Sequence, residues 1–169
     1  PESASGVSLY LVPANAAGLT FTPSSFSEIA AAPSTMRHGV MVDGAAAISL
    51  KLDGVKVEAS HQLKGGAEAI EQVQALANLA RAAEALGIME RIFAETSDYL
   101  RTREQFGVTL SSFQALQHRM VQNYVSIEQA RALINLALVS WKTPEFEKAV
   151  LGARAFISEA SIALGHDMM

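Results

Sequence analysis

The residues best suited to chemistry lie in one short segment, 101–107, between two long stretches with helical periodicity. The segment holds two guanidinium groups, an amide, an aromatic ring and a glycine: Arg101, Arg103, Gln105, Phe106 and Gly107. A guanidinium pairs with phosphate through two parallel hydrogen bonds, and the start of the next helix adds free N–H groups and a positive dipole end. The segment is therefore a candidate pyrophosphate site. A helix C-terminus with favourable arginine charges and a glycine stop explains the same residues, so both interpretations stay open at this point.

Other catalytic signatures are absent from the sequence, including G-x-G-x-x-G, the Walker loop, G-x-S-x-G and H-E-x-x-H. Glu58 and His61 have the E-x-x-H spacing of di-iron bundles, but it occurs once, at a predicted strand end or loop. We expect a polar loop there and predict no metal site. The chain has no cysteine, which excludes disulfides, thiolate zinc sites and a cysteine nucleophile.

The composition narrows the class of partner. The 169 residues are 50% hydrophobic and 18% charged, with a formal net charge of −4 and no basic run. We therefore expect no nucleic-acid partner. The longest apolar run, 132–139, contains Asn135 and is far shorter than the roughly 20 residues of a membrane span, so none is predicted. The lack of cysteine fits a reducing compartment, and we expect a cytoplasmic protein of bacterial type.

The first third of the chain has the composition of β structure. Five segments rich in β-forming residues are expected as strands: 6–12, 19–22, 40–42, 45–52 and 55–57. Asp-Gly pairs at 43–44 and 53–54 suit tight type I′ turns. Alternation in the fourth segment predicts a buried face and a solvent-exposed face. The expected buried set is Ile48, Leu50 and Leu52, and the expected exposed set is Ser49, Lys51 and Asp53.

From Gly65 onward the sequence predicts three long helices, at about 68–100, 112–141 and 143–164. The packing face expected on the first helix is Val73, Leu76, Ala80, Ala83 and Gly87. The face expected on the second is Phe113, Leu116, Met120, Tyr124, Ile127, Ile134, Leu138 and Trp141, with one gap at Arg131.

Helix ends have their own signals. Residues 111–114 suggest a capping box for the second helix. Thr143 is expected to cap the third helix, with Pro144 at its first position and Gly165 at its end. The predicted fold class is α+β: antiparallel strands, part of a β barrel or sandwich domain over 1–63, followed by an up-down bundle of long α-helices over 64–169. We expect the bundle to be incomplete and the chain to be a fragment.

Several segments resemble the acyl-CoA dehydrogenase family. They are Glu-Ala-Leu-Gly at 84–87, Asp-Tyr-Leu-Arg-Thr-Arg-Glu-Gln-Phe-Gly at 98–107 and Ser-Phe-Gln-Ala-Leu-Gln-His-Arg at 112–119. The pattern Y-x-x-x-R-x-Q-F-G followed shortly by F-Q is specific. Residues 6–13 and 52–57 resemble the closing strands of the family's middle β domain, so the resemblance covers nearly the whole chain.

The resemblance implies a flavoenzyme. Members bind FAD and desaturate an acyl-CoA thioester between Cα and Cβ. A carboxylate removes the α proton, hydride passes to the flavin, and the electrons leave to an electron-transferring flavoprotein. The implied fold is an N-terminal helical domain, a middle β domain and a C-terminal four-helix bundle. Tetramers are usual, with the bundles at their centre.

The resemblance also implies roles for four residues. Arg103 would bind the FAD pyrophosphate, Gln105 and Phe106 would contact the adenosine-diphosphate part, and Gln114 would hydrogen-bond the cofactor. In the family this loop reaches the FAD of a neighbouring subunit.

No catalytic residue is expected in this chain. The family glutamate is expected beyond Met169. A minority of members carry it on the first long helix, where Ala77 stands here and cannot act as a base. Asn78 stands where some members have an arginine. The fragment alone is therefore expected to be inactive.

A second possibility is a catalytically degenerate, structural subunit that completes a partner's FAD site. The local sequence also resembles smaller subunits of two-subunit dehydrogenases that act on dicarboxyl-CoA or steroid side-chain thioesters. A homotetramer and a heterotetramer with a second dehydrogenase subunit both stay open.

Overall fold

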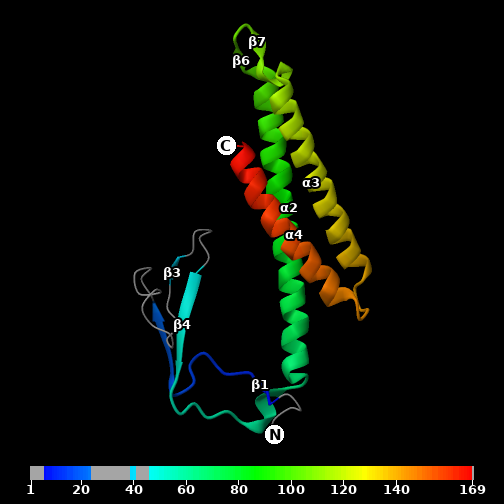
Figure 1. Cartoon of the computed structure of the whole chain (residues 1–169). Coiled ribbons are helices and arrows are strands. Elements are labelled where there is room, and N and C mark those ends of the chain that lie inside the picture. Colours follow the sequence, from blue (N-terminus) through cyan, green and yellow to red (C-terminus); the bar gives the residue numbers. More distant parts are fainter. Residues whose placement is uncertain (1–5, 24–38, 41–45, 169) are drawn as a thin grey trace. The chain divides into compact units, whose positions relative to one another are not determined.

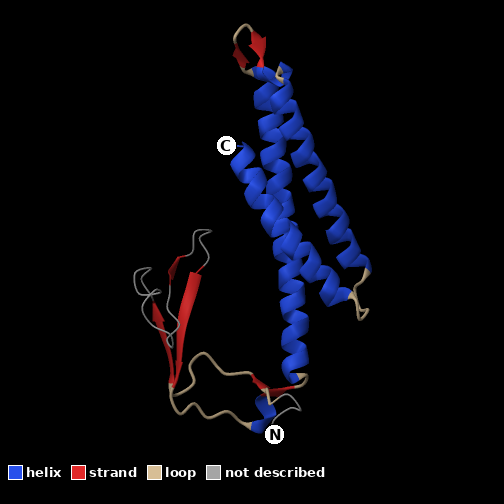
Figure 2. Ribbon diagram, in the orientation of Figure 1, coloured by secondary structure: helices blue, strands red, loops and turns tan. Residues whose placement is uncertain are grey.

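The structure is a computed structural model that describes residues 6–23, 39–40 and 46–168. It divides into two compact units, Pro1–Ala67 and Glu68–Met169. Figures 1 and 2 show strands in the first unit and long helices in the second. The predicted fold class, antiparallel strands followed by a bundle of long helices, is confirmed.

The first unit is built on a three-stranded antiparallel sheet. Its strands are β2 (Leu19–Pro23), β4 (Ala46–Leu52) and β3 (Gly39–Val40), in that spatial order. A separate pair joins β1 (Leu9–Tyr10) to β5 (Gln62–Leu63), next to the short 3-10 helix η1 (Ala59–His61).

The β2–β4 pairing depends on a glycine. Asp53 N donates to Gly18 O at 2.8 Å at the end of the pairing, and Gly18 has a φ of +86°. A Cβ on Gly18 would lie 2.1 Å from Asp53 O. Both the backbone conformation and the close approach therefore require glycine there.

Two strand predictions were wrong, and the face prediction was right only in part, since Lys51 and Asp53 are exposed as expected. Residues 55–57 form no strand, and the segment predicted over 6–12 is a strand only at Leu9–Tyr10. Ser49, expected on the exposed face, is 2% exposed, whereas Leu52 is 60% exposed. Leu52 lies opposite Leu19 in the β2–β4 pairing. The turn predicted at 43–44 lies outside the described residues.

The second unit contains the three predicted helices. They are α2 (Gly66–Thr102), α3 (Gln114–Val139) and α4 (Phe146–Met168), which run in alternating directions (Figure 1). Their core is formed by Ala75, Leu79, Ala82, Leu86 and Met89 of α2, Ile127, Ala130, Ile134 and Ala137 of α3, and Phe146, Val150, Ala153, Ile157 and Leu164 of α4. Within the described residues, no helix is both long and apolar enough to cross a membrane.

The packing face was predicted wrongly for α2 and partly correctly for α3. On α2 the prediction was wrong, because Val73 and Leu76 are 64% and 43% exposed while Leu79 and Met89 are buried. Alanines occur all round this helix, so their spacing does not identify one face. On α3 the prediction was partly right: Ile127 and Ile134 are buried, but Tyr124, Leu138 and Trp141 are exposed.

The predicted helix ends differ in detail. The capping box does not form, because residues 110–112 are the 3-10 helix η2 (Leu110–Ser112) and Phe113 caps α3 without a side-chain hydrogen bond. Thr143 accepts a bond from Glu145 N at 3.3 Å, but in a turn that precedes α4. Gly165 lies inside α4, which continues to Met168.

Arg131 explains the gap in the apolar pattern of α3. Its Nη2 lies 2.7 Å from Glu90 Oε1 on α2, and its Nη1 pairs with Glu128 on its own helix. The hydrogen bonds that Arg131 donates to Glu90 and then to Glu128 raise the pKa of Arg131 above its ordinary value. The residue therefore links two helices through charge rather than through apolar packing.

Candidate functional site

The segment between α2 and α3 forms a tight β-hairpin, which the sequence analysis did not predict. Its strands are β6 (Glu104–Gln105) and β7 (Val108–Thr109). Arg103 lies at its base: Arg103 N donates to Tyr99 O at 2.9 Å, and Leu110 N donates to Arg103 O at 2.8 Å. These two bonds hold Arg103 between the end of α2 and the hairpin.

Phe106 and Gly107 form the tip of the hairpin. Their φ angles are +56° and +80°, and positive φ at both central residues is the pattern of a type I′ turn. Glycine adopts this conformation freely, but a bulky residue does so rarely and at a cost of about 1–3 kcal/mol. The Phe106 side chain is nevertheless 93% exposed, so burial does not offset that cost.

The start of α3 lies directly beyond the hairpin and is held by side chains. Ser112 Oγ donates to Thr109 O at 2.7 Å, and Gln117 Nε2 donates to Ser111 O at 2.8 Å. The first bond that closes onto the helix runs from Leu116 N to Phe113 O at 3.0 Å. The N–H groups of residues 114 and 115 therefore lack helical acceptors and are available to an anion.

The two arginines of the segment differ in their partners. Arg101 Nη1 lies 3.1 Å from Asp98 Oδ1. Among the described residues, no carboxylate lies within ion-pair distance of the Arg103 guanidinium, which is exposed. Arg103 is therefore the cation of the segment whose charge is available for a ligand.

An apolar groove of about 320 Å³ lies beside this segment. Its lining comes from α2, η2 and α3 and consists of Phe93, Ser97, Leu100, Arg101, Ser111, Gln117, Met120 and Val121. Sequence reasoning missed the groove because its lining residues are spread over about 30 positions and carry no common motif. The signal that could have indicated the groove is that the end of α2 lies next to the start of α3.

The predicted cofactor residues lie together at one end of the bundle. Arg103, Gln105 and Phe106 belong to the hairpin region, and Gln114 is the first residue of α3 (Figure 1). The Gln105 amide donates to the Glu104 carbonyl at 2.7 Å. The alternative catalytic position is elsewhere: the helical rise places Ala77 about 38 Å from the C-terminal end of α2. The structure thus does not bring Ala77 near the hairpin.

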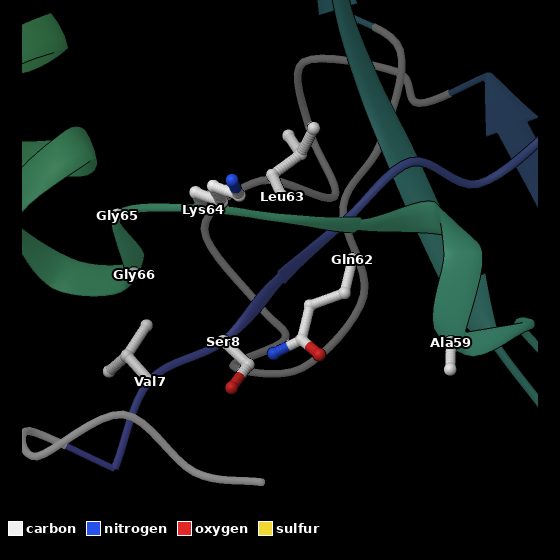
Figure 3. Close-up of a pocket in the computed structure, with 8 residues that line it drawn as sticks. All are labelled: Val7, Ser8, Ala59, Gln62, Leu63, Lys64, Gly65 and Gly66. Carbon is white, nitrogen blue, oxygen red and sulfur yellow. The ribbon is translucent and has the colours of Figure 1, made fainter.

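A larger cavity, of about 480 Å³, lies in the first unit. Figure 3 shows its lining residues, which come from the segment before β1 and from the junction of η1, β5 and α2: Val7, Ser8, Ala59, Gln62, Leu63, Lys64, Gly65 and Gly66. Lys64 is its one charged lining residue. Size alone therefore favours this cavity, but the chemistry favours the hairpin. In the described part of the chain, no group of three or more potential metal ligands comes together.

Comparison with known proteins identifies the family of this chain. The family described as "Acyl-CoA dehydrogenase, C-terminal domain" matches residues 64–169. The chain belongs to the acyl-CoA dehydrogenase family. Acyl-CoA dehydrogenase FadE27 of Mycobacterium tuberculosis is 35% identical over 96 residues, 57% of this chain and 25% of that protein. Acyl-CoA dehydrogenase IpdE2 of Mycolicibacterium smegmatis is 42% identical over 88 residues, 52% of this chain and 27% of that protein.

Solved structures of acyl-CoA dehydrogenases have the same fold. A chain of the ChsE4–ChsE5 complex from Mycobacterium tuberculosis superposes with a TM-score of 0.78 at 26% identity, covering 99% of this chain and 42% of that one. Butyryl-CoA dehydrogenase from Megasphaera elsdenii, at 20% identity and a TM-score of 0.79, shares the fold over 99% of this chain and 42% of its own. The chain thus spans about a quarter of these curated relatives and two-fifths of these solved chains.

Proposed function

We propose that this chain is part of an FAD-dependent acyl-CoA dehydrogenase, and that the hinge of residues 101–114 binds the pyrophosphate of the FAD. The proposal is carried by two features of the hinge: the exposed Arg103 guanidinium, which has no carboxylate partner among the described residues, and the N–H groups of residues 114 and 115, which lack helical acceptors. The pyrophosphate of a dinucleotide carries the negative charge and the acceptor oxygens that both of these donor groups bind.

The residues of the hinge fit the cofactor in chemical type. Arg103 would pair with phosphate oxygens through its planar fork of donors, and the backbone N–H groups of residues 114 and 115 would donate to the same group. The exposed Phe106 ring and the Gln105 amide would contact the adenosine-diphosphate part. The Gln114 side chain forms no capping box and has no hydrogen-bond partner among the described residues, so its amide would be available to the cofactor. When bound, FAD supplies the acceptor for the hydride that leaves the acyl-CoA substrate.

The α-proton acceptor of the whole protein is proposed to lie outside residues 1–169. Ala77 has no ionisable group, and Asn78 beside it accepts a bond from Arg154 Nη1 at 3.1 Å. Residues 1–63 are proposed as the end of the middle β domain and residues 64–169 as most of the helical bundle domain. We further propose that the whole protein passes its electrons to an electron-transferring flavoprotein. We also propose that it is cytoplasmic.

A second candidate function is a structural subunit that completes a partner's FAD site. The structural match to the ChsE4–ChsE5 complex favours this alternative, because that protein is a complex of two different chains and the match covers 99% of this chain. Co-purification of the full-length protein with a second dehydrogenase subunit, without activity when each is isolated, would support this alternative. Activity of the full-length protein as a homotetramer would exclude it.

The test of the FAD site is the affinity of the full-length protein for FAD. Charge-assisted hydrogen bonds contribute about 1.5–3 kcal/mol, so Arg103→Ala should raise the dissociation constant for FAD by about 10- to 150-fold. Arg91→Ala is the matched control, because Arg91 lies on α2, which leads into the hinge, and its guanidinium pairs with Glu95 at 2.7 Å. An Arg103→Ala protein that binds FAD within twofold of the unchanged protein would refute the assigned role.

A further inference from the structure

Phe113 joins the two halves of the hinge. Its carbonyl oxygen accepts bonds from Leu116 N at 3.0 Å and Gln117 N at 3.1 Å, so its backbone begins α3. Its ring meets the Phe106 ring edge to face, with centroids 6.3 Å apart and an interplanar angle of 90°. One half-buried residue therefore contacts the exposed tip of the hairpin and also fixes the helix start.

The contact between the two rings orients Phe106 without covering it. Perpendicular aromatic pairs at centroid distances of 4.5–7 Å are attractive. Because Phe106 remains 93% exposed, nearly all of its ring stays available to a ligand. Phe113 is also the one aromatic residue in contact with that ring in the described part of the chain. Without it, the Phe106 side chain would rotate freely in solvent.

We propose that Phe113 is a positioning residue that fixes the direction of the Phe106 ring before the cofactor binds. This inference rests on the proposed FAD site and adds a residue that acts through Phe106 rather than on the cofactor. Pre-ordering one side chain removes the entropy cost of ordering it on binding. Loss of the Phe113 ring should therefore weaken FAD binding by about two- to tenfold, without changing the ligand contacts themselves.

The bonds around η2 make this separation of roles testable. Ser112 Oγ and the Gln117 amide hold η2 through backbone acceptors, and neither bond uses the Phe113 ring. Replacing the ring should therefore leave the start of α3 in place. Phe113→Leu keeps an apolar side chain but removes the aromatic ring, whereas Phe113→Tyr keeps the ring.

The experiment measures the FAD dissociation constant of the full-length protein in a double-mutant cycle. Phe113→Leu should raise the constant two- to tenfold, and Phe113→Tyr should restore it to within twofold of the unchanged protein. In a Phe106→Ala background, Phe113→Leu should have no further effect, because its action requires the Phe106 ring. The unfolding midpoint of the FAD-free protein should be alike for the Leu and Tyr variants.

Two results would overturn the inference: an unchanged constant in Phe113→Leu, or an equal loss with and without Phe106. Arg103→Ala, measured in parallel, separates this inference from the proposed function. If Arg103→Ala weakens binding and Phe113→Leu does not, only the positioning role fails. If neither variant changes the constant, the FAD site itself is wrong.

Discussion

The strained tip of the hairpin provides a prediction in which stability and cofactor binding move in opposite directions. Phe106 has a φ of +56° and is followed by Gly107, at positions where Asn-Gly is the preferred pair. Asparagine adopts positive φ more readily than phenylalanine. Phe106→Asn should relieve about 1–2 kcal/mol of backbone strain.

The loss of the ring takes little away from the folded state. Phe106 is 93% exposed and makes one edge-to-face contact with Phe113, which limits the lost contact to about 0.5 kcal/mol. The net expectation is that Phe106→Asn stabilises the FAD-free protein by about 1 kcal/mol. FAD affinity should fall in the same variant, because the ring that contacts the cofactor is gone.

Urea unfolding of the FAD-free protein and FAD titration of the folded protein measure the two effects. Gly107→Ala is the matched control at the neighbouring position. A Cβ there would meet no atom within 4 Å, so its effect comes from the φ of +80° alone. It should destabilise by about 1 kcal/mol. The reasoning is refuted if Phe106→Asn lowers stability as Gly107→Ala does, or if it raises stability without weakening FAD binding.

Three further predictions concern the framework that carries the hinge. Leu164→Ala should cost about 2–5 kcal/mol of unfolding free energy in urea denaturation, because Leu164 is 0% exposed in the bundle core, and a cost under 1 kcal/mol would contradict that packing. Asn123→Ala should cost about 1–3 kcal/mol in the same assay, since the buried amide donates to Arg119 O at 3.0 Å and Asp167 Oδ2 at 3.1 Å. Gly18→Ala should speed hydrogen exchange in β2 and β4 but leave exchange in α3 unchanged, because the added Cβ would meet a backbone oxygen at 2.1 Å. Unaltered exchange in β2 would show that the close approach is not maintained.

Local sequence predicted the existence of the helices and the place of the hinge. Arg103, Gln105 and Phe106 are nearly contiguous, so their chemistry was visible in one segment without knowledge of the fold. The length of α2 followed from its Ala, Glu and Leu content. These features depend on neighbours in the chain, which the sequence displays directly.

The features that sequence reasoning missed depend on three-dimensional packing. The buried face of α2 was misjudged because alanines surround the helix and either face could pack closely. The capping box predicted at 111–114 does not form, because Ser111 and Ser112 belong to η2 and Phe113 caps α3. The strain at Phe106 comes from its positive φ. The residue type does not predict this angle, because phenylalanine rarely adopts positive φ.

The most direct test is a crystal structure of the full-length protein with FAD bound. The account predicts that the Arg103 guanidinium lies within hydrogen-bond distance of pyrophosphate oxygens, of its own subunit's FAD or of a neighbour's, with the N–H groups of residues 114 and 115 directed at the same phosphates. An Arg103 side chain far from every FAD in the assembly would contradict it.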